Sequence, residues 1–212
     1  MTWLSNNIAE VLHLFVAHLA LALPAIVIAV IISIPLAWLA HKRDKVREPL
    51  LEGISLLYAI PSLALFILVP SLLGFDIRSN ANIIIVLAIY GTAILIRTCT
   101  EAFDVVPANI RQAADACGYT TWKRFWAVDL PLAIPVTMAG VRVVAVSTIS
   151  LVTVGSVIGV RSLGTLFTDG FQRGIVPEIL TGLVLTVLLA LIVDALCVAL
   201  ERVLAPWAKE RT

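Results

Sequence analysis

Long apolar stretches without charged residues alternate with short polar segments along this chain. A stretch of about 20 such residues is what an α-helix needs to cross the hydrocarbon core of a bilayer, which is about 30 Å thick. Five stretches fit this description: residues 14–40, 53–75, 81–96, 132–160 and 179–200. The third has only 16 residues, so we expect its flanks to extend it or neighbouring helices to shield it. The pattern predicts an all-α membrane protein with one transmembrane domain, 1–212, and about five transmembrane helices.

Several of these stretches contain proline, which interrupts most helices in water. Transmembrane helices keep proline more easily because neighbouring helices satisfy the freed backbone groups, and a kink commonly results. We therefore expect kinks at the prolines of the first, second and fourth stretches, which are Pro24, Pro35, Pro61, Pro70 and Pro135. The first stretch has 27 residues and no Lys or Arg before it, so we expect a retained helix rather than a cleaved signal peptide.

The composition excludes a water-soluble globular protein. Apolar residues make up 60% of the chain, charged residues only 14%, and the mean hydropathy is +1.03. A soluble domain carries charge at about a quarter of its positions. The main surroundings of this chain are therefore expected to be the lipid bilayer. A net charge of +1 without a long basic run predicts no nucleic-acid partner.

Basic residues are distributed unevenly between the two sides of the predicted bundle. Eleven of the 15 Lys and Arg residues lie between the first and second stretches, between the third and fourth, or after the fifth. The opposite side receives only Arg78, Arg161 and Arg173. Cytoplasmic loops of membrane proteins are enriched in Lys and Arg, so this distribution predicts an N-terminus outside and a C-terminus inside the cell. An odd number of spans is then required, which agrees with five.

One inner connection, residues 97–131, is too long to be a simple turn. Its apolar residues recur at spacings suited to one helical face: Ala114, Cys117, Trp122, Phe125 and Trp126. Gly118 interrupts them, so the pattern predicts a helix-turn-helix around a glycine, with Pro131 starting the next helix. Two interfacial helices that lie on lipid head groups, anchored by Trp122 and Trp126, would have the same pattern. Physical reasoning alone leaves both interpretations open.

The same connection resembles the EAA loop of permease subunits of ABC importers. That motif reads Glu-Ala-Ala, three residues, Gly, nine residues, and then Ile-x-Leu-Pro. This chain keeps the spacing throughout, with Gln112, Ala113, Ala114, Gly118, Val128, Leu130 and Pro131. Gln112 and Val128 replace the Glu and the Ile of the family. In that family the loop sits in a groove of the cytoplasmic ATPase, so the resemblance implies that these residues and Trp122 belong to an ATPase-coupling loop.

Other segments are similar to permeases for quaternary ammonium osmoprotectants such as glycine betaine, choline and carnitine. They are residues 60–64, 130–142, the segment around Gly164, 177–178 and 200–202. The resemblance therefore runs from the first predicted span to the C-terminal tail. Residues 159–164 depart from it, because relatives often carry a glycine run at this place on the outer side.

The resemblance implies an assembly in the bacterial cytoplasmic (inner) membrane. This multi-pass chain would work with a dimer of cytoplasmic ABC ATPases, a second permease copy or a paralogue, and an extracytoplasmic substrate-binding protein. The chain has no Gly-x-x-x-x-Gly-Lys-Ser/Thr loop, so ATP is expected to be hydrolysed by the partner and not by this subunit. We expect no bound cofactor and no metal, and predict buried apolar roles for Cys99, Cys117 and Cys197.

Two charged residues, Arg142 and Asp194, fall inside predicted spans. An ionisable group in lipid is costly unless it is paired or reaches water. Counted from the inner ends of their spans, Arg142 and Asp194 lie at similar depths, so we predict that they form a pair. A place on the substrate path is the alternative role.

Hydroxyl groups in the spans are candidates for lining such a path. The residues selected are Tyr58, Tyr90, Ser147 and Ser150. Tyrosine rings attract quaternary ammonium ions through their faces. Serine also lets helices pack closely, which is an equally common use of the residue in membranes. The sequence shows no obvious aromatic cage, so we expect the tight binding site on the binding protein.

Two other functions compete with this interpretation. An ABC permease for another small solute, such as an amino acid, would have the same general features. An intramembrane enzyme that uses Asp194 or Ser156 is a remote alternative. It would need a second carboxylate or a histidine deep in a span, and the three histidines lie in the first span or at its inner end.

Overall fold

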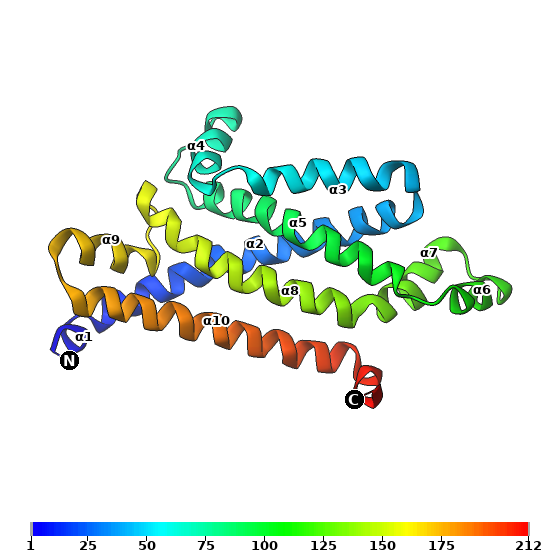
Figure 1. The fold of residues 1–212 in the computed structure, drawn as a ribbon. Helices are drawn as coiled ribbons and strands as arrows, with labels where there is room; N and C mark the ends of the chain where they lie inside the picture. The colour runs from blue at the N-terminus through cyan, green and yellow to red at the C-terminus, as the bar shows by residue number, and fades with distance from the viewer. Residues whose placement is uncertain (1, 212) are drawn as a thin grey trace.

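The computed structural model describes residues 2–211 as a bundle of helices, and no strand occurs in that range. The two end residues of the predicted domain, 1–212, lie outside the described residues. The long helices run side by side along the bundle, with the short ones at its two ends (Figure 1). The elements are α1 (Thr2–Asn6), α2 (Ile8–Lys42), α3 (Asp44–Ala59), α4 (Ser62–Leu73), α5 (Asn80–Asp104), α6 (Ala108–Ala116), α7 (Thr121–Arg124), the π-helix η1 (Phe125–Asp129), α8 (Leu130–Val152), the 3-10 helix η2 (Thr153–Ile158), α9 (Gly164–Arg173), α10 (Val176–Leu204) and the 3-10 helix η3 (Pro206–Arg211).

Helix α5 is the centre of the bundle. Of its most apolar stretch 67% is buried, against 11% for α10, which therefore faces outward along most of its length. Glycines let the neighbours of α5 approach closely: a Cβ at Gly91 would lie 2.8 Å from the Cβ of Ala29 in α2. A Cβ at Gly140 in α8 would lie 2.8 Å from Leu95 of α5. Small residues at such crossings are how transmembrane helices gain packing energy.

Four helices or helix runs are long and apolar enough to span a membrane, and one bent pair is a fifth candidate. This agrees with the predicted all-α fold of about five spans. The second stretch, 53–75, does not form one continuous helix as predicted. It is divided into α3 and α4, which are bent by 106° at Ile60 and Pro61. Pro61 has no N–H to continue the α3 ladder, and this is the physical reason for the break.

The third stretch is longer than its apolar residues suggest. Helix α5 has 25 residues, so polar flanks extend the predicted 81–96 at both ends. Ser79 caps its start by accepting a hydrogen bond from the N–H of Asn82. The long connection consequently begins after Asp104 and not at Arg97, which corrects the predicted start of the loop.

The fourth span is continuous with the polar segment before it. Pro131 lies in the first turn of α8, as predicted, but helical structure runs without interruption from Thr121 to Ile158, so α8 is not separate from the segment before it. A π-turn absorbs the proline: the N–H of Leu130 donates to the carbonyl of Phe125, five residues back. The other predicted kink sites lie within helices that continue past them, namely Pro24, Pro35, Pro70 and Pro135.

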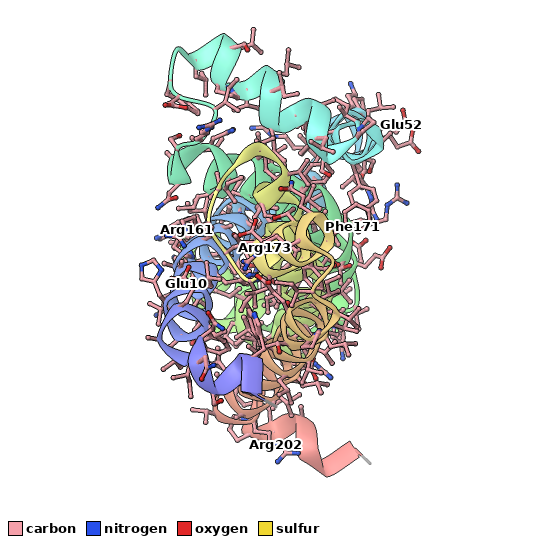
Figure 2. All side chains as sticks on the ribbon, turned by 90° about the vertical axis from the view of Figure 1, so that its left-hand side faces the viewer. Glu10, Glu52, Arg161, Phe171, Arg173 and Arg202 are labelled. Atoms are coloured by element: carbon pink, nitrogen blue, oxygen red, sulfur yellow. The ribbon has the colours of Figure 1, made fainter. Side chains whose placement is uncertain are left out.

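The two ends of the bundle are different in make-up. Helices α1, α4 and α9 gather at one end, and α6 and α7 form the other, toward which α10 and the C-terminus also run (Figure 1). The α9 end carries Arg161 and Arg173, and Figure 2 looks onto it with Arg161 beside Glu10 of α2. The segments of the sequence that are rich in Lys and Arg therefore lie at the opposite end of the bundle from these few arginines.

Candidate functional site

The segment between α5 and α8 is a helix-turn-helix. Helix α6 ends at Ala116 with Cys117 as its C-cap, and Gly118 turns the chain with a φ of +78°, a conformation that costs glycine little. Thr120 caps α7, since its hydroxyl accepts a hydrogen bond from the N–H of Lys123. The N–H of Tyr119 donates to the carbonyl of Ala114 and closes the turn. The predicted pair of short helices around a glycine is confirmed.

The aromatic residues of this segment share one face, as their spacing predicts: the ring centroids of Trp122, Phe125 and Trp126 lie within 5.7 Å of one another. Ala114 and Phe125 are buried, whereas Trp122 is 62% exposed and Trp126 is 55% exposed. Cys117 is exposed too, which corrects its predicted burial. Phe125 faces the core, and the two tryptophans that contact it lie at the edge of the same aromatic cluster. The motif residues divide similarly: Gln112, Ala113 and Gly118 are exposed, and Leu130 and Pro131 are half-buried.

A buried carboxylate fixes the helix-turn-helix to the base of α8. Asp129 is 2% exposed and lies between two arginines. Nε of Arg111, from α6, donates to its Oδ1 at 3.0 Å, and Nε of Arg124, from α7, lies 3.5 Å from its Oδ2. Arg111 also donates to the carbonyl of Phe103 near the end of α5. Arg124 further donates to Asp115 of α6, at 2.5 and 2.7 Å. We call these side chains the Asp129 cluster.

Aromatic rings join the same segment to α2. Phe125 lies 4.7 Å from Trp38, measured between ring centroids, and Trp122 lies 6.3 Å from it. The ammonium group of Lys42 stands 3.9 Å above the Trp38 ring, a cation–π distance. The sequence does not indicate the contacts of Trp38 with Phe125 and Trp122, or the Asp129 cluster, because these residues lie on different helices and share no helical spacing. The charged residues of the inner segment are the signal that could have indicated the cluster.

The two charges within the spans meet between α8 and α10. Nε and Nη2 of Arg142 donate to the two carboxylate oxygens of Asp194 at 2.7 and 2.9 Å. This bidentate geometry is the strongest form of such a pair. The side chains stay 40% and 28% exposed, so the pair lies on the surface of the bundle and not in its core.

The four hydroxyl residues selected as path candidates line one groove of about 540 Å³: Tyr58, Tyr90, Ser147 and Ser150. The rings of Tyr58 and Tyr90 are 5.8 Å apart and nearly perpendicular. A second groove of about 280 Å³ adjoins it and shares Tyr58 and Ser147. Together they follow α8 where it faces α3 and α5. Among the residues that the structure describes, no charged side chain lines either groove, so the polar groups of the lining are rings, hydroxyls and backbone groups.

The side chains considered for an intramembrane enzyme, Ser156 and Asp194, already have other hydrogen-bond partners. The hydroxyl of Ser156 donates to the carbonyl of Thr153, and Asp194 is paired with Arg142. Within residues 2–211, no group of three His, Cys, Asp or Glu side chains could hold a metal ion. Cys99 is buried and Cys197 half-buried, in agreement with apolar roles for both.

Comparison with protein families and curated proteins gives a consistent result. The family model described as "Binding-protein-dependent transport system inner membrane component" matches residues 25–210. The osmoprotectant import permease protein OsmW of Salmonella typhimurium is 31% identical over 207 residues, covering 96% of either chain. The glycine betaine/carnitine/choline transport system permease protein OpuCB of Bacillus subtilis is 29% identical over 206 residues, covering 97% of this chain and 94% of its own.

The fold is also found among solved structures. An inward-facing conformation of the MetNI methionine ABC transporter superimposes with a TM-score of 0.81, over 92% of this chain and 96% of the other. At 18% sequence identity this likeness concerns the fold alone. The similarity covers almost all of the chain, from the first long helix to the last.

Proposed function

We propose, from the premise that this chain belongs to the family of binding-protein-dependent transport system inner membrane components, that it is the permease subunit of an ATP-driven importer for quaternary ammonium compatible solutes. Glycine betaine, choline and carnitine are the expected substrates. The observation that carries the proposal is full-length similarity to permeases named for these solutes. The groove between α3 and α8 supports it, since two tyrosine rings and two serines can pass such a cation without holding it tightly.

We place the ATPase at the end formed by α6 and α7. Two exposed tryptophans and the exposed Gln112–Ala113 edge offer a surface there, and the basic segments of the chain indicate the cytoplasmic side. Because helical structure is continuous from Thr121 to Ile158, a movement of this end is transmitted along α8. When a pair of ATPases closes on ATP and moves α6 and α7, the π-turn and α8 move with them, and the groove along α8 changes shape.

A second permease copy, identical or related, completes the path. The groove is open on one side, where α8 presents an exposed face that includes Val143 and Val146. The Arg142–Asp194 pair joins α8 to α10, and partly exposed charges inside a bilayer need cover by protein or water. A partner that packs on this face would close the groove and cover the pair. The binding protein would dock at the opposite end, near α9.

Uptake by the reconstituted importer tests the proposal. The chain is co-purified with its ATPase, placed in proteoliposomes with the binding protein, and given radiolabelled glycine betaine, choline or proline. We expect ATP-dependent uptake of the quaternary ammonium compounds. Uptake of proline alone would favour the rival function, an amino-acid permease. ATP hydrolysis without uptake of any quaternary ammonium compound would reject the proposed substrate class.

Coupling is tested at the glycine turn. Gly118→Pro cannot adopt the positive φ and removes the N–H that donates to Asp115, so insertion should be normal while ATP hydrolysis no longer drives uptake. Gly74→Pro is the matched control, because Gly74 also has a positive φ and donates its N–H, to Pro70, at the opposite end of the bundle. Normal transport by the Gly118 variant would count against docking at this turn.

A further inference from the structure

The break between α3 and α4 forms one wall of the groove. The groove is lined by the whole interruption, from Tyr58 through Ser62, facing Tyr90 of α5 and the serines of α8. Helix α3 is 16 residues long and rises about 24 Å, so the break lies toward the α4 and α9 end of the bundle. Non-helical backbone at membrane depth is tolerated where it is buried in protein or lines a water-filled cavity. The groove beside the break meets the second condition.

The end of α3 presents carbonyl oxygens that lack partners across the break. The N–H of Ile60 donates to Leu57, and the carbonyl of Ile60 accepts from the hydroxyl of Tyr90. Within residues 2–211, no N–H from beyond α3 donates to the carbonyls of Tyr58 or Ala59, because Pro61 has no N–H and α4 begins in a new direction. The last carbonyls of a helix carry partial negative charge, which favours a nearby cation.

A tyrosine ring stands beside these carbonyls. Tyr58 is 56% exposed, so much of its ring is open to a molecule in the groove. Tyr90 is 4% exposed and holds the break in place through its hydroxyl, with its ring perpendicular to that of Tyr58. A quaternary ammonium group has no N–H and cannot donate a conventional hydrogen bond. Ring faces and carbonyl dipoles are therefore the groups that can attract it.

We propose that the α3–α4 break is a transient site for the quaternary ammonium headgroup on its way through the permease, formed by the face of Tyr58 and the terminal carbonyls of α3. The inference rests on the proposed function, because it names the site where that substrate would pass. The site contains no carboxylate, so it attracts the cation without trapping it, as a passage site must. Tyr90 is a positioning residue, since it acts through the Ile60 carbonyl.

Substitutions at Tyr58 test the site in the complete importer, with wild-type binding protein and ATPase throughout. Tyr58→Leu removes the ring and should lower the maximal rate of radiolabelled choline uptake about five- to tenfold at saturating loaded binding protein. Tyr58→Phe and Tyr58→Trp keep a ring and should stay within about twofold of wild type. Trp207→Leu is the control, because Trp207 is an aromatic residue of similar exposure in the C-terminal η3.

The outcomes separate this inference from the proposed function. Co-purification with the ATPase should be unchanged in all variants, because Tyr58 lies in the groove and not at the α6–α7 end. If wild type transports choline and Tyr58→Leu does so at the same rate, the passage site is wrong and the proposed function stands. If Tyr58→Phe loses as much as Tyr58→Leu, the ring face is not the attractive group. If wild type hydrolyses ATP but moves no quaternary ammonium compound, both proposals fail.

Discussion

The two ends of the helix bundle are held together by different forces. At the α6–α7 end, charged side chains converge on the buried Asp129, and three segments of the chain are joined by its arginine partners. At the α9 end, the contacts are steric: a Cβ at Gly164 would lie 2.3 Å from the carbonyl oxygen of Thr153. The described residues form two ion pairs there: Arg161 with Glu10 is largely exposed and so contributes little, and the exposed Arg173 stands 3.9 Å from the buried Glu178.

This difference fits different mechanical roles of the two ends. An end that receives force from an ATPase has to keep its shape while it moves, and buried charge pairs fix the geometry of the segments that they join. At the α9 end, Gly164 lies very close to the backbone of η2. A small change in the spacing of these two segments would therefore move the C-terminal end of α8. Both ends act on the same helix, because α8 begins at the Asp129 cluster and ends in η2 beside Gly164.

The largest expected effect comes from removing the carboxylate of the inner end. Asp129→Ala leaves Arg111 and Arg124 without their buried partner, and we expect a loss of about 3–5 kcal/mol in the free energy of unfolding. The measurement is unfolding of the purified chain in mild detergent by increasing amounts of sodium dodecyl sulfate. Asp115→Ala removes a carboxylate that is 52% exposed and should cost about 1 kcal/mol or less. Equal losses in both variants would contradict the special role of Asp129.

The pair within the spans should have the next largest effect. Arg142→Ala and Asp194→Ala each leave one unpaired charge in the bilayer, so each should lower the yield of stably inserted protein. The exchanged variant, Arg142→Asp with Asp194→Arg, restores opposite charges and should recover most of the yield. Membrane yield is measured by quantitative blotting. Failure of both the exchange and the double alanine variant to restore any yield would remove support for pairing as the reason for these charges.

A methyl group at the outer end should have a smaller effect. Gly164→Ala forces the backbones of α9 and η2 apart, and overpacking of this kind costs about 1–3 kcal/mol in the free energy of unfolding. Gly53→Ala is the control, because a Cβ there meets nothing within 4 Å and alanine favours the helix by about 1 kcal/mol. The same detergent titration compares the two. A stable Gly164→Ala protein would show that the α9 end is not held by this close approach.

The smallest effect is expected for the exposed ion pair. Arg161→Ala removes a side chain that is 61% exposed, and we expect a change of about 1 kcal/mol or less that diminishes further in high salt. The detergent titration at two salt concentrations measures it. A loss as large as that of Asp129→Ala would erase the contrast between the two ends.

The sequence predicts the long helices well and their junctions poorly. The apolar stretches and the positive φ at Gly118 follow from local residue types, as does the helical content of the polar connection. The break at Pro61 and the uninterrupted passage through Pro131 do not, because both residues are prolines in apolar surroundings. The difference lies in the backbone around them: a π-turn absorbs Pro131, and a tyrosine hydroxyl from another helix binds the freed carbonyl before Pro61.

The residues of the candidate site were likewise predictable only in part. Residue types alone indicated Arg142 with Asp194, and the tyrosines and serines of the groove, since charges and rings are conspicuous in an apolar sequence. The Asp129 cluster was not predictable, because Arg111 and Asp129 meet only when the chain turns at Gly118 and enters α8. The spacing of the inner segment predicted the shared face of Trp122, Phe125 and Trp126, but not that both tryptophans remain exposed on it.

We propose that the α6–α7 end faces the cytoplasm and docks the ATPase. Cys117 lies exposed in that turn, while Cys99 is buried and Cys197 half-buried on α10. A membrane-impermeant maleimide is therefore a direct probe of that one position. We predict labelling of Cys117 in inside-out vesicles, none in intact cells, and protection when the ATPase subunits are bound. Labelling of Cys117 from the outside of intact cells, or equal labelling with and without the ATPase, would contradict the claim.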